Sequence, residues 1–188
     1  MARDAKKRMV EGAVVLLAKH GLQATSFSEV LALTGAPRGS VYHHFPDGKE
    51  QLVASALELA GTRAIDVLDQ LEGASASEVT QRFLDLWRAI LERSHYSAGC
   101  AVLAVTIATD SPQLLDQAST IFRTWRSRLA DLLAAGGLDE ADAGRFAAIL
   151  VAASEGAVVL SRAEQSMEPF DLVAAQLLEQ LDGLAGRT

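Results

Sequence analysis

The stretch TSFSEVLALTGAPRGSVYHHFPDGKEQL, residues 25–52, decides how the chain is interpreted. Ser26 and Glu29 have the spacing of a capping box, in which each side chain satisfies a backbone N–H at the start of a helix. That helix is expected to end at Gly35, because glycine readily adopts the left-handed backbone of a tight turn, and Pro37 favours the first turn of a new helix. Two short helices joined by a glycine turn predict a helix-turn-helix.

The second of these helices, expected over residues 37–44, carries small, cationic and hydrogen-bonding side chains where a core helix would carry apolar ones. Glycine and serine allow DNA to approach the backbone, arginine can pair with guanine or phosphate, and tyrosine and histidine can contact phosphate or base edges. Val41 and Phe45 are expected to face the core instead. The next helix begins with a lysine, whose charge and neighbouring N–H groups suit a phosphate. The DNA-contacting residues indicated by this pattern are Arg38, Gly39, Ser40, Tyr42, His43 and Lys49.

This stretch resembles the DNA-binding region of the TetR family of transcriptional regulators. The family pattern begins with a Thr before the first of the two helices and a Thr-Gly turn after it. The second helix then carries a Gly, a Tyr, a His or Tyr, and a Phe, and a Lys and a Leu follow. The matching residues in this sequence are Thr25, Thr34, Gly35, Gly39, Tyr42, His44, Phe45, Lys49 and Leu52. Pro37 departs from the pattern, because many members carry a capping Ser there, and it is left out of the DNA site. The resemblance implies one group that contacts the DNA backbone: Thr25, Ser26, Tyr42, His44 and Lys49. It implies a second group that reads bases: Arg38, Ser40 and His43.

Several of these residues also have a purely structural interpretation. Tyr42 and Phe45 could both be core aromatics, and we adopt that interpretation for Phe45 only. The adjacent His43 and His44 could bind a metal, but neighbours on a helix point about 100° apart and the sequence offers no nearby third ligand. We therefore expect no metal and no other cofactor. The Thr-Ser pair ahead of the first helix could simply cap it, a role compatible with phosphate binding.

Charge is unevenly distributed along the chain, whose overall net charge is −7. Residues 1–50 hold seven Lys and Arg against five Asp and Glu, a net charge of +2, so residues 51–188 carry −9. A basic end on an acidic body approaches phosphates in one orientation, which fits a DNA-binding protein in spite of the negative total.

The N-terminal segment combines basic residues with an apolar stretch but lacks the features of a signal peptide. Lys19 and His20 directly follow the apolar stretch, and its apolar positions recur at helical spacing. The uncharged apolar run at residues 98–109 is well short of the roughly twenty residues that span a bilayer. Cys100 is the only cysteine, which excludes an intrachain disulfide and fits a reducing compartment. We expect a soluble, cytoplasmic protein with Cys100 as a small buried residue.

The whole pattern predicts an all-α fold, because Leu and Ala dominate and apolar positions recur at three and four over about nine helical segments. We expect a three-helix helix-turn-helix DNA-binding domain over residues 1–50 and a helical-bundle domain for ligand binding and dimerisation over residues 51–188. The fourth helix, residues 47–71, is long enough to enter both. Residues 51–188 contain no nucleophile elbow, phosphate loop or HExxH motif, so an enzyme is not expected.

Aromatic side chains fall on helix faces of the expected bundle, either as ordinary core or as the lining of an apolar pocket for a small molecule. The Gly99-Cys100 pair and the helices around Trp125 and Glu155 resemble the TetR branch of the lincomycin-resistance and quercetin-responsive repressors. This resemblance implies an apolar or aromatic effector and a neighbouring efflux or detoxifying gene as target. Glu155 could orient the ligand, face solvent, or pair with a nearby arginine. The candidate pocket residues are Phe83, Trp87, Cys100, Phe122, Trp125 and Glu155.

A homodimer is expected, because one short helix reads few base pairs whereas two copies spaced by a helical turn or its multiple read a palindrome. Residues 141–162 and 169–184 have wide apolar faces, so two helices from each subunit would form an isologous four-helix interface. A monomer that buries these faces internally is the alternative.

The expected function is a ligand-responsive repressor that an effector releases from its operator. In this mechanism, the effector shifts the fourth helix and changes the spacing of the two recognition helices. Activation through the same geometry stays open. Two other classes of protein also stay open. A helical-bundle enzyme would show turnover or a bound cofactor, and a DNA-binding factor without an effector would have a bundle without a cavity.

Overall fold

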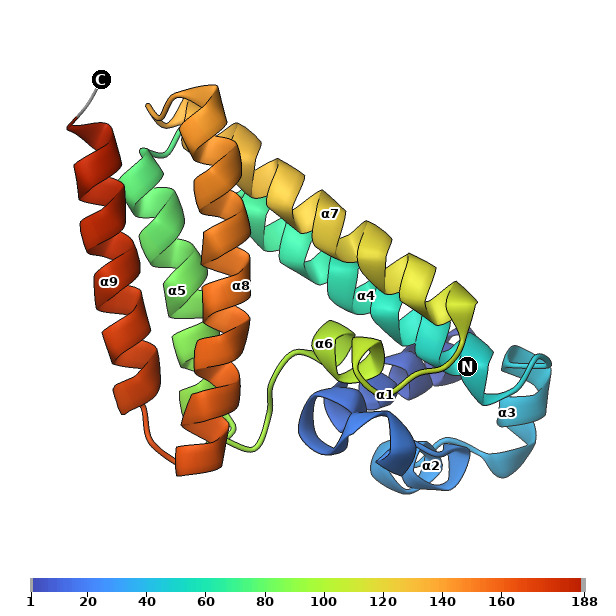
Figure 1. Cartoon of the computed structure of the whole chain (residues 1–188). Coiled ribbons are helices and arrows are strands. Elements are labelled where there is room, and N and C mark those ends of the chain that lie inside the picture. Colours follow the sequence, from blue (N-terminus) through green and yellow to red (C-terminus); the bar gives the residue numbers. More distant parts are fainter. Residues whose placement is uncertain (1, 187–188) are drawn as a thin grey trace. The chain divides into compact units, whose positions relative to one another are not determined.

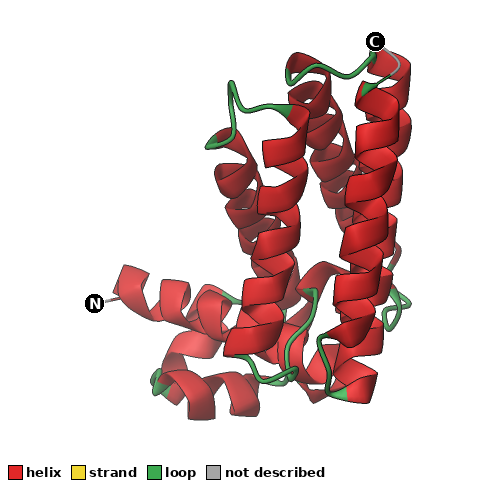
Figure 2. Cartoon of the chain, turned by 90° about the vertical axis from the view of Figure 1, so that its left-hand side faces the viewer, coloured by secondary structure: helices red, strands yellow, loops and turns green. Residues whose placement is uncertain are grey.

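The computed structural model describes residues 2–186, and side-chain environments from Asp4 onward (Figure 1). Within these residues the chain forms nine helices and no strand, which confirms the expected all-α fold (Figure 2). The helices are α1 (Ala2–Ala24), α2 (Phe27–Thr34), α3 (Arg38–His44), α4 (Lys49–Asp69), α5 (Ala76–Arg93), α6 (Ala101–Thr106), α7 (Pro112–Ala135), α8 (Glu140–Glu164) and α9 (Glu168–Ala185).

The chain folds into two compact units, each assembled from two separate stretches of sequence. Unit 1 runs to Arg63 and takes in Cys100–Ile121 later in the chain. Unit 2 holds Ala64–Gly99 and continues from Phe122. Helix α6 and the first part of α7 therefore belong to the same unit as α1, α2 and α3. This division concerns packing, and the functional boundary expected at residue 50 stays a prediction.

Helix α1 is the central element of unit 1. Met9, Ala13 and Leu17 recur every four residues along it and are fully buried, as expected for one face of a core helix. Helices α2 and α6 both pack against α1. The contact with α2 is close at Gly12, where an added Cβ would lie 2.5 Å from Thr34 Cγ2. Glycine at this position therefore allows α2 to approach α1.

The first part of α4 is fastened to two other helices of unit 1. The side-chain amide of Gln117 in α7 donates a 2.9 Å hydrogen bond to the carbonyl of Ala54 in α4. Arg63 in α4 forms a 2.9 Å ion pair with Glu11 in α1. These bonds join segments that are far apart in the sequence, so local sequence patterns could not predict them.

Unit 2 is a helical bundle in which α5, α8 and α9 lie side by side (Figure 1). Large side chains from all three helices fill its core, among them Leu84, Leu91, Phe146, Leu150 and Phe170, each at most 2% exposed. At the edge of this core, Arg88 in α5 forms a 2.6 Å ion pair with Asp171 in α9 and lies over the Phe170 ring. The apolar faces of the last two helices are thus partly used inside the unit.

Two polar arrangements fix the ends of helices in unit 2. Helix α5 begins with a complete capping box, in which Ser75 Oγ accepts from the Glu78 N–H and the Glu78 carboxylate accepts from the Ser75 N–H at 2.9 Å. These bonds to Ser75 hold the pKa of Glu78 below its ordinary value. Arg128 in α7 bonds Glu72 at 2.6 Å and Asp69 at 2.7 Å, which raises its own pKa. The arginine thereby holds α7 against the end of α4.

Helix α8 is, by length and composition alone, apolar enough to cross a membrane. Half of its most apolar window is buried inside the protein. A core helix of a soluble bundle passes the same test, so the hydropathy of α8 reflects its burial and the apolar face that it leaves exposed.

Candidate nucleic-acid interface

The helix-turn-helix is formed by α2, a glycine turn and α3. Ser26 caps α2, since its Oγ accepts from the Glu29 N–H at 3.2 Å. Gly35 ends α2 in the left-handed conformation, with φ 63°, and its N–H donates to the carbonyl of Leu31. Both boundaries agree with the sequence prediction. Pro37 differs slightly: it precedes the first residue of α3 as its N-cap, with extended backbone, and does not lie inside the helix.

Helix α3 is anchored by two apolar side chains, as predicted. Val41 and Phe45 are 2% and 1% exposed. The Phe45 ring packs against Phe27 of α2, with ring centroids 6.2 Å apart, and Lys6 Nζ of α1 lies 5.9 Å from its centre. Helix α3 is therefore held on one side only, and its other side faces solvent.

The solvent side of α3 carries the side chains predicted to contact DNA. Tyr42 is 80% exposed, and Arg38, Gly39 and His43 are exposed as well. Ser40 is half-buried, and its Oγ donates to the Pro37 carbonyl at 2.6 Å. Because the exposed Tyr42 ring does not pack in the core, its position favours the predicted contact with phosphate over a structural role.

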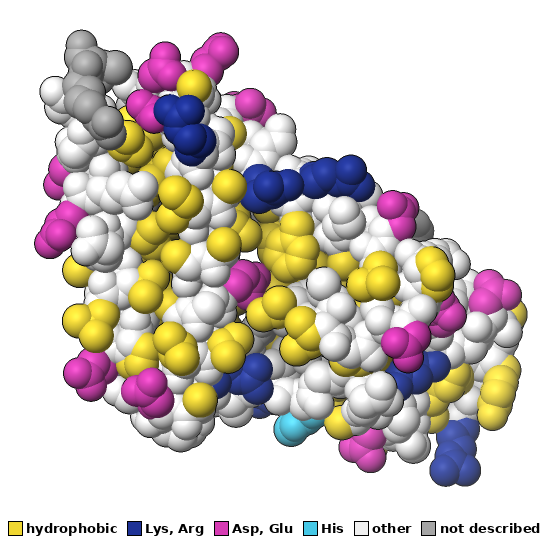
Figure 3. Space-filling model, in the orientation of Figure 1, with side chains coloured by type: hydrophobic (Ala, Val, Ile, Leu, Met, Phe, Trp, Pro, Cys, Tyr) yellow, Lys and Arg dark blue, Asp and Glu magenta, His cyan; other side chains and the backbone are white. Residues whose placement is uncertain are grey.

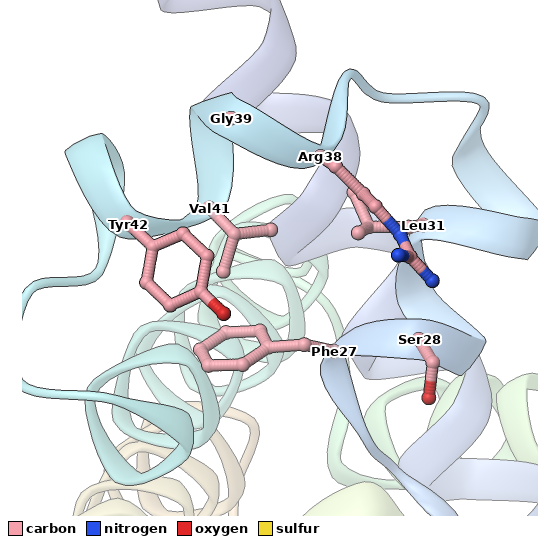
Figure 4. A pocket seen from close by; sticks show the side chains of 7 residues that line it. All are labelled: Phe27, Ser28, Leu31, Arg38, Gly39, Val41 and Tyr42. Carbon is pink, nitrogen blue, oxygen red and sulfur yellow. The ribbon is translucent and has the colours of Figure 1, made fainter.

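A groove of about 440 Å³ lies between α2 and α3. Figure 4 shows the Tyr42 and Arg38 side chains extending from α3 towards α2, with the Tyr42 hydroxyl near the Phe27 ring. The α2 side of this groove was not predicted from sequence. The lining residues are Phe27, Ser28, Leu31, Arg38, Gly39, Val41 and Tyr42.

Two of the predicted DNA-contacting residues are engaged inside the protein. Thr25 is fully buried, and its Oγ1 donates to the carbonyl of Gly21 at 2.8 Å. Lys49 Nζ donates to the carbonyl of Leu22 at 2.7 Å. Both bonds end on the last turn of α1, which breaks at Gly21 with φ 77°. These residues hold the end of α1 to the starts of α2 and α4, and their contact with DNA stays a prediction.

Sequence reasoning used the basic side chains near the start of α1 only in the charge of residues 1–50 and did not include them among the DNA-contacting residues. Lys6, Lys7 and Arg8 are all exposed, and Lys6 lies beside the C-terminal end of α3 through its contact with Phe45. The available signal was the run of basic residues itself. Only the fold shows that Lys6 of this run lies beside Phe45, at the C-terminal end of α3.

The candidate ligand-pocket residues fall in both compact units, Cys100 in unit 1 and the other five in unit 2. The structure pairs Phe122 with Trp125 in α7, edge to face at 5.4 Å, and buries Glu155 in α8, so Glu155 does not face solvent. Cys100 is buried as expected, but it belongs to unit 1, where its Sγ caps α6. Phe83 and Trp87 are buried in α5. Their role in a pocket stays a prediction.

Buried polar atoms of unit 2 add one observation. Within the described chain, Trp87 Nε1 and Ser154 Oγ are buried and make no hydrogen bond. Buried donors of this kind are uncommon in folded proteins, and water or a ligand often satisfies them. They favour an interior that accepts a polar group.

Comparisons with known proteins agree with this architecture. Residues 9–56 match the family described as bacterial regulatory proteins, tetR family, and residues 76–176 match the C-terminal domain of LmrA/YxaF-like transcriptional regulators. An uncharacterised HTH-type transcriptional regulator of Mycobacterium tuberculosis, Rv0196, is 32% identical over 179 residues, which are 92% of this chain and 91% of the relative. The HTH-type transcriptional regulator LmrA of Bacillus subtilis is 26% identical over 171 residues, 89% of this chain and 91% of LmrA.

Solved structures show the same fold. A TetR transcriptional regulator from Chloroflexus aurantiacus superimposes with a TM-score of 0.81 at 28% identity, over 96% of each chain. The regulatory protein TetR from Rhodobacter sphaeroides gives a TM-score of 0.84 at 20% identity, over 93% of this chain and 97% of that one. The family matches and the relatives confirm both resemblances drawn from the sequence: this chain belongs to the TetR family of transcriptional regulators, in the LmrA/YxaF-like branch.

Proposed function

We propose that this TetR-family regulator is a cytoplasmic, homodimeric repressor that leaves a palindromic operator when a small apolar or aromatic effector binds. The observation that carries the proposal is the solvent side of α3, where Tyr42 is 80% exposed beside Arg38 and Gly39. Members of this family are regulators and not enzymes, so these side chains serve recognition and not catalysis.

The roles on DNA follow from side-chain chemistry and position. Arg38, Ser40 and His43 present donors and acceptors that suit base edges in the major groove. Tyr42 and His44 flank them and suit phosphate, as does Ser26 at the N-terminus of α2. Thr25 and Lys49 contribute by fixing the end of α1, and Lys49 retains two further N–H donors for a phosphate while it bonds the Leu22 carbonyl.

The dimer is supported by the outer surface of α8 and α9. Four large apolar side chains there are between 42% and 67% exposed: Ile149, Val159, Leu160 and Leu172. Figure 3 shows apolar side chains spread over both helices. Exposed apolar side chains do not stabilise a monomer, whereas a second copy of the chain packed against this surface would bury them.

Effector binding would act on DNA affinity through the helices shared by the two units. Helices α4 and α7 each pass from unit 1 to unit 2, so a ligand that favours one arrangement of unit 2 can bias the start of α4, next to the helix-turn-helix. Because a duplex accepts one spacing of two recognition helices, this bias weakens operator binding by the ligand's differential affinity, about 1–3 kcal/mol.

The first test is binding to duplex DNA from the gene's own upstream region, measured by fluorescence anisotropy at two salt concentrations. We expect nanomolar affinity that falls steeply with salt. Arg38→Ala and Tyr42→Ala should each weaken binding about 10- to 100-fold. Arg93→Ala removes another exposed cation, from α5, and serves as the matched control, with unchanged affinity. Equal losses in all three variants would contradict an interface on α3.

The second test adds effector candidates, flavonoid-like compounds and antibiotics, to the preformed complex. Release of the DNA by a candidate that also raises the melting temperature of the free protein supports the repressor. Tight, sequence-preferring binding that no compound disturbs would favour a DNA-binding factor without an effector.

A further inference from the structure

The α2–α3 groove, the hollow of about 440 Å³ between α2 and α3, has an apolar floor. Phe27 and Leu31 of α2 line it and are half-buried, together with the buried Val41 of α3. The Phe27 ring packs against Phe45, with ring centroids 6.2 Å apart, which supports the floor from the core. Apolar surface that is open to water gains free energy when a partner of matching shape covers it.

The rim of the α2–α3 groove is exposed and lies on the solvent side of α3. Arg38, Gly39 and Tyr42 form the rim on α3, and Ser28 forms it on α2. In Figure 4 the Phe27 and Tyr42 rings lie at one end of the groove, and the Arg38 and Ser28 side chains lie at the other. Beyond its own part of the helix, a Cβ added at Gly39 would meet no described atom within 4 Å, so the groove is open there. The groove is therefore continuous with the surface proposed to contact DNA.

DNA offers few apolar groups to a groove of this kind. In the major groove of DNA the base edges present hydrogen-bond donors and acceptors, and the apolar group among them is the C5-methyl of thymine. Phosphate oxygens and the polar atoms of base edges would lose water against Phe27 and Leu31 without gaining a hydrogen bond. A methyl group gains free energy by the same transfer. The apolar floor therefore matches thymine and not the other three bases.

The polar side chains of the lining suit the surroundings of such a methyl group. The guanidinium of Arg38 can pair with a guanine or a phosphate next to the thymine. The Tyr42 ring forms a wall of the groove, and its hydroxyl remains available for a phosphate. Ser28 Oγ lies 2.7 Å from the Oγ of Ser26, the N-cap of α2, so the two hydroxyls can share one phosphate. Polar contacts thus flank the apolar one on both sides.

We propose that the α2–α3 groove binds the methyl-bearing edge of a thymine in each half of the operator, with Phe27, Leu31 and the Tyr42 ring as its apolar contacts. This inference rests on the DNA contact of α3 proposed above and adds a sequence preference to it. The operator then requires a pyrimidine with a C5-methyl group at a fixed position of each half-site, and Leu31 of α2 takes part in reading the sequence.

A thymine scan of the upstream duplex tests the preference. Each thymine is replaced in turn by deoxyuridine, which lacks only the methyl group, and affinity is measured by fluorescence anisotropy. At one position or more in each half-site the replacement should weaken binding about fourfold, the effect of one buried methyl group. Replacement in both half-sites should weaken it about fifteenfold. A duplex whose thymines all tolerate deoxyuridine overturns the inference.

A second pair of duplexes isolates the methyl group from the hydrogen-bonding edge of the base. At the sensitive position the A·T pair is replaced by G·C, with either cytosine or 5-methylcytosine. These two duplexes present the same donors and acceptors, so 5-methylcytosine should bind about fourfold more tightly than cytosine. Equal affinities would contradict recognition of the methyl group.

Two leucines of α2 supply the matched variants that locate the contact. Leu31→Ala removes part of the floor, whereas Leu33→Ala removes a leucine that is 52% exposed and does not line the groove. The ratio of affinities for the thymine and deoxyuridine duplexes should fall below about twofold in Leu31→Ala and stay at about fourfold in Leu33→Ala. Because each ratio compares two duplexes with one protein, a loss of folded protein cancels. An unchanged ratio in Leu31→Ala would place the methyl group outside the groove.

The same titrations separate this inference from the proposed function. Tight binding to a duplex that tolerates deoxyuridine at every thymine leaves the DNA-binding function intact and refutes thymine recognition. A protein that binds the upstream duplex no more tightly than a duplex of scrambled sequence refutes both.

Discussion

Helices α3 and α5 show two different ways in which this sequence makes a helix. Helix α5 has 18 residues, begins with a complete capping box and buries seven side chains. Helix α3 has 7 residues, begins at Arg38 after an N-cap Pro37 that offers no side-chain cap, and is held by Val41 and the following Phe45. A helix as short as α3 is unstable alone, so its conformation depends on what it packs against.

The difference explains where each helix can carry function. In α5, many positions are taken by buried apolar residues or by the residues of the cap, so this helix serves mainly to build the bundle. In α3, the two anchors Val41 and Phe45 fix the helix, and Arg38, Gly39, Tyr42 and His43 are exposed to solvent. Substitutions on the outer side of α3 should therefore change DNA binding without changing stability, and substitutions in α5 should do the opposite.

The largest expected effect is the loss of the aromatic anchor of α3. Phe45→Ala should lower the free energy of unfolding by about 3–5 kcal/mol, because it leaves a cavity between Phe27 and α1. Circular dichroism reports all helices, whereas both tryptophans lie in unit 2, so the two signals separate the units during urea unfolding. Circular dichroism should show the earlier transition.

The matched control is Tyr42→Ala, which removes an aromatic ring from the exposed side of the same helix. Its stability should stay within about 0.5 kcal/mol of the parent. Equal destabilisation by the two variants would contradict the division of α3 into an anchored side and a recognition side.

The next effect concerns Lys49, which lies between structure and recognition. Lys49→Ala removes the bond to the Leu22 carbonyl and should lower the free energy of unfolding by about 2 kcal/mol. If the ammonium also meets a phosphate, the slope of log affinity against log salt concentration falls by about one unit for every DNA sequence alike. A lower stability with an unchanged salt slope would restrict Lys49 to fixing the end of α1.

Much of the fold could be predicted from local signals. The cap at Ser26, the turn at Gly35 and the anchors Val41 and Phe45 depend on residues within a few positions of one another, so spacing alone indicates them. The bond from Lys49 to Leu22 could not be predicted this way, because the two residues are 27 positions apart and are brought together only by the bend at Gly21. The same lysine suits a phosphate or a helix end equally well.

Local sequence patterns also could not predict which helices belong to each of the two units. Helix α6 reads as one more apolar segment of the bundle, but it packs against α1 in unit 1. Its six residues carry no signal for their partner, because Ala, Val and Leu fit any apolar surface. Cys100, expected near the aromatic residues of the bundle, belongs to unit 1 for the same reason.

The smallest expected effect tests the other half of the comparison, the local stabilisation of α5. Ser75→Ala removes the cap of α5 and should lower the free energy of unfolding by about 1 kcal/mol without changing DNA affinity. Ser77→Ala, an exposed serine two positions later, is the control and should change stability by less than about 0.5 kcal/mol. A loss of DNA affinity in Ser75→Ala would show that α5 is not independent of recognition.

The capping box also predicts a pH dependence whose sign follows from Glu78. Because bonds to Ser75 lower the pKa of Glu78 in the folded protein, its ionised form stabilises the fold above the pKa of the unfolded chain. This stabilisation is lost as the pH falls through the lowered folded-state pKa, where the carboxyl group becomes protonated in both states. Glu78→Gln should therefore be less stable than the parent at neutral pH, and the difference should shrink in acid. Urea unfolding of both proteins across this pH range measures the difference, and a gap that stays constant with pH would mean that the charge of Glu78 does not contribute to the cap.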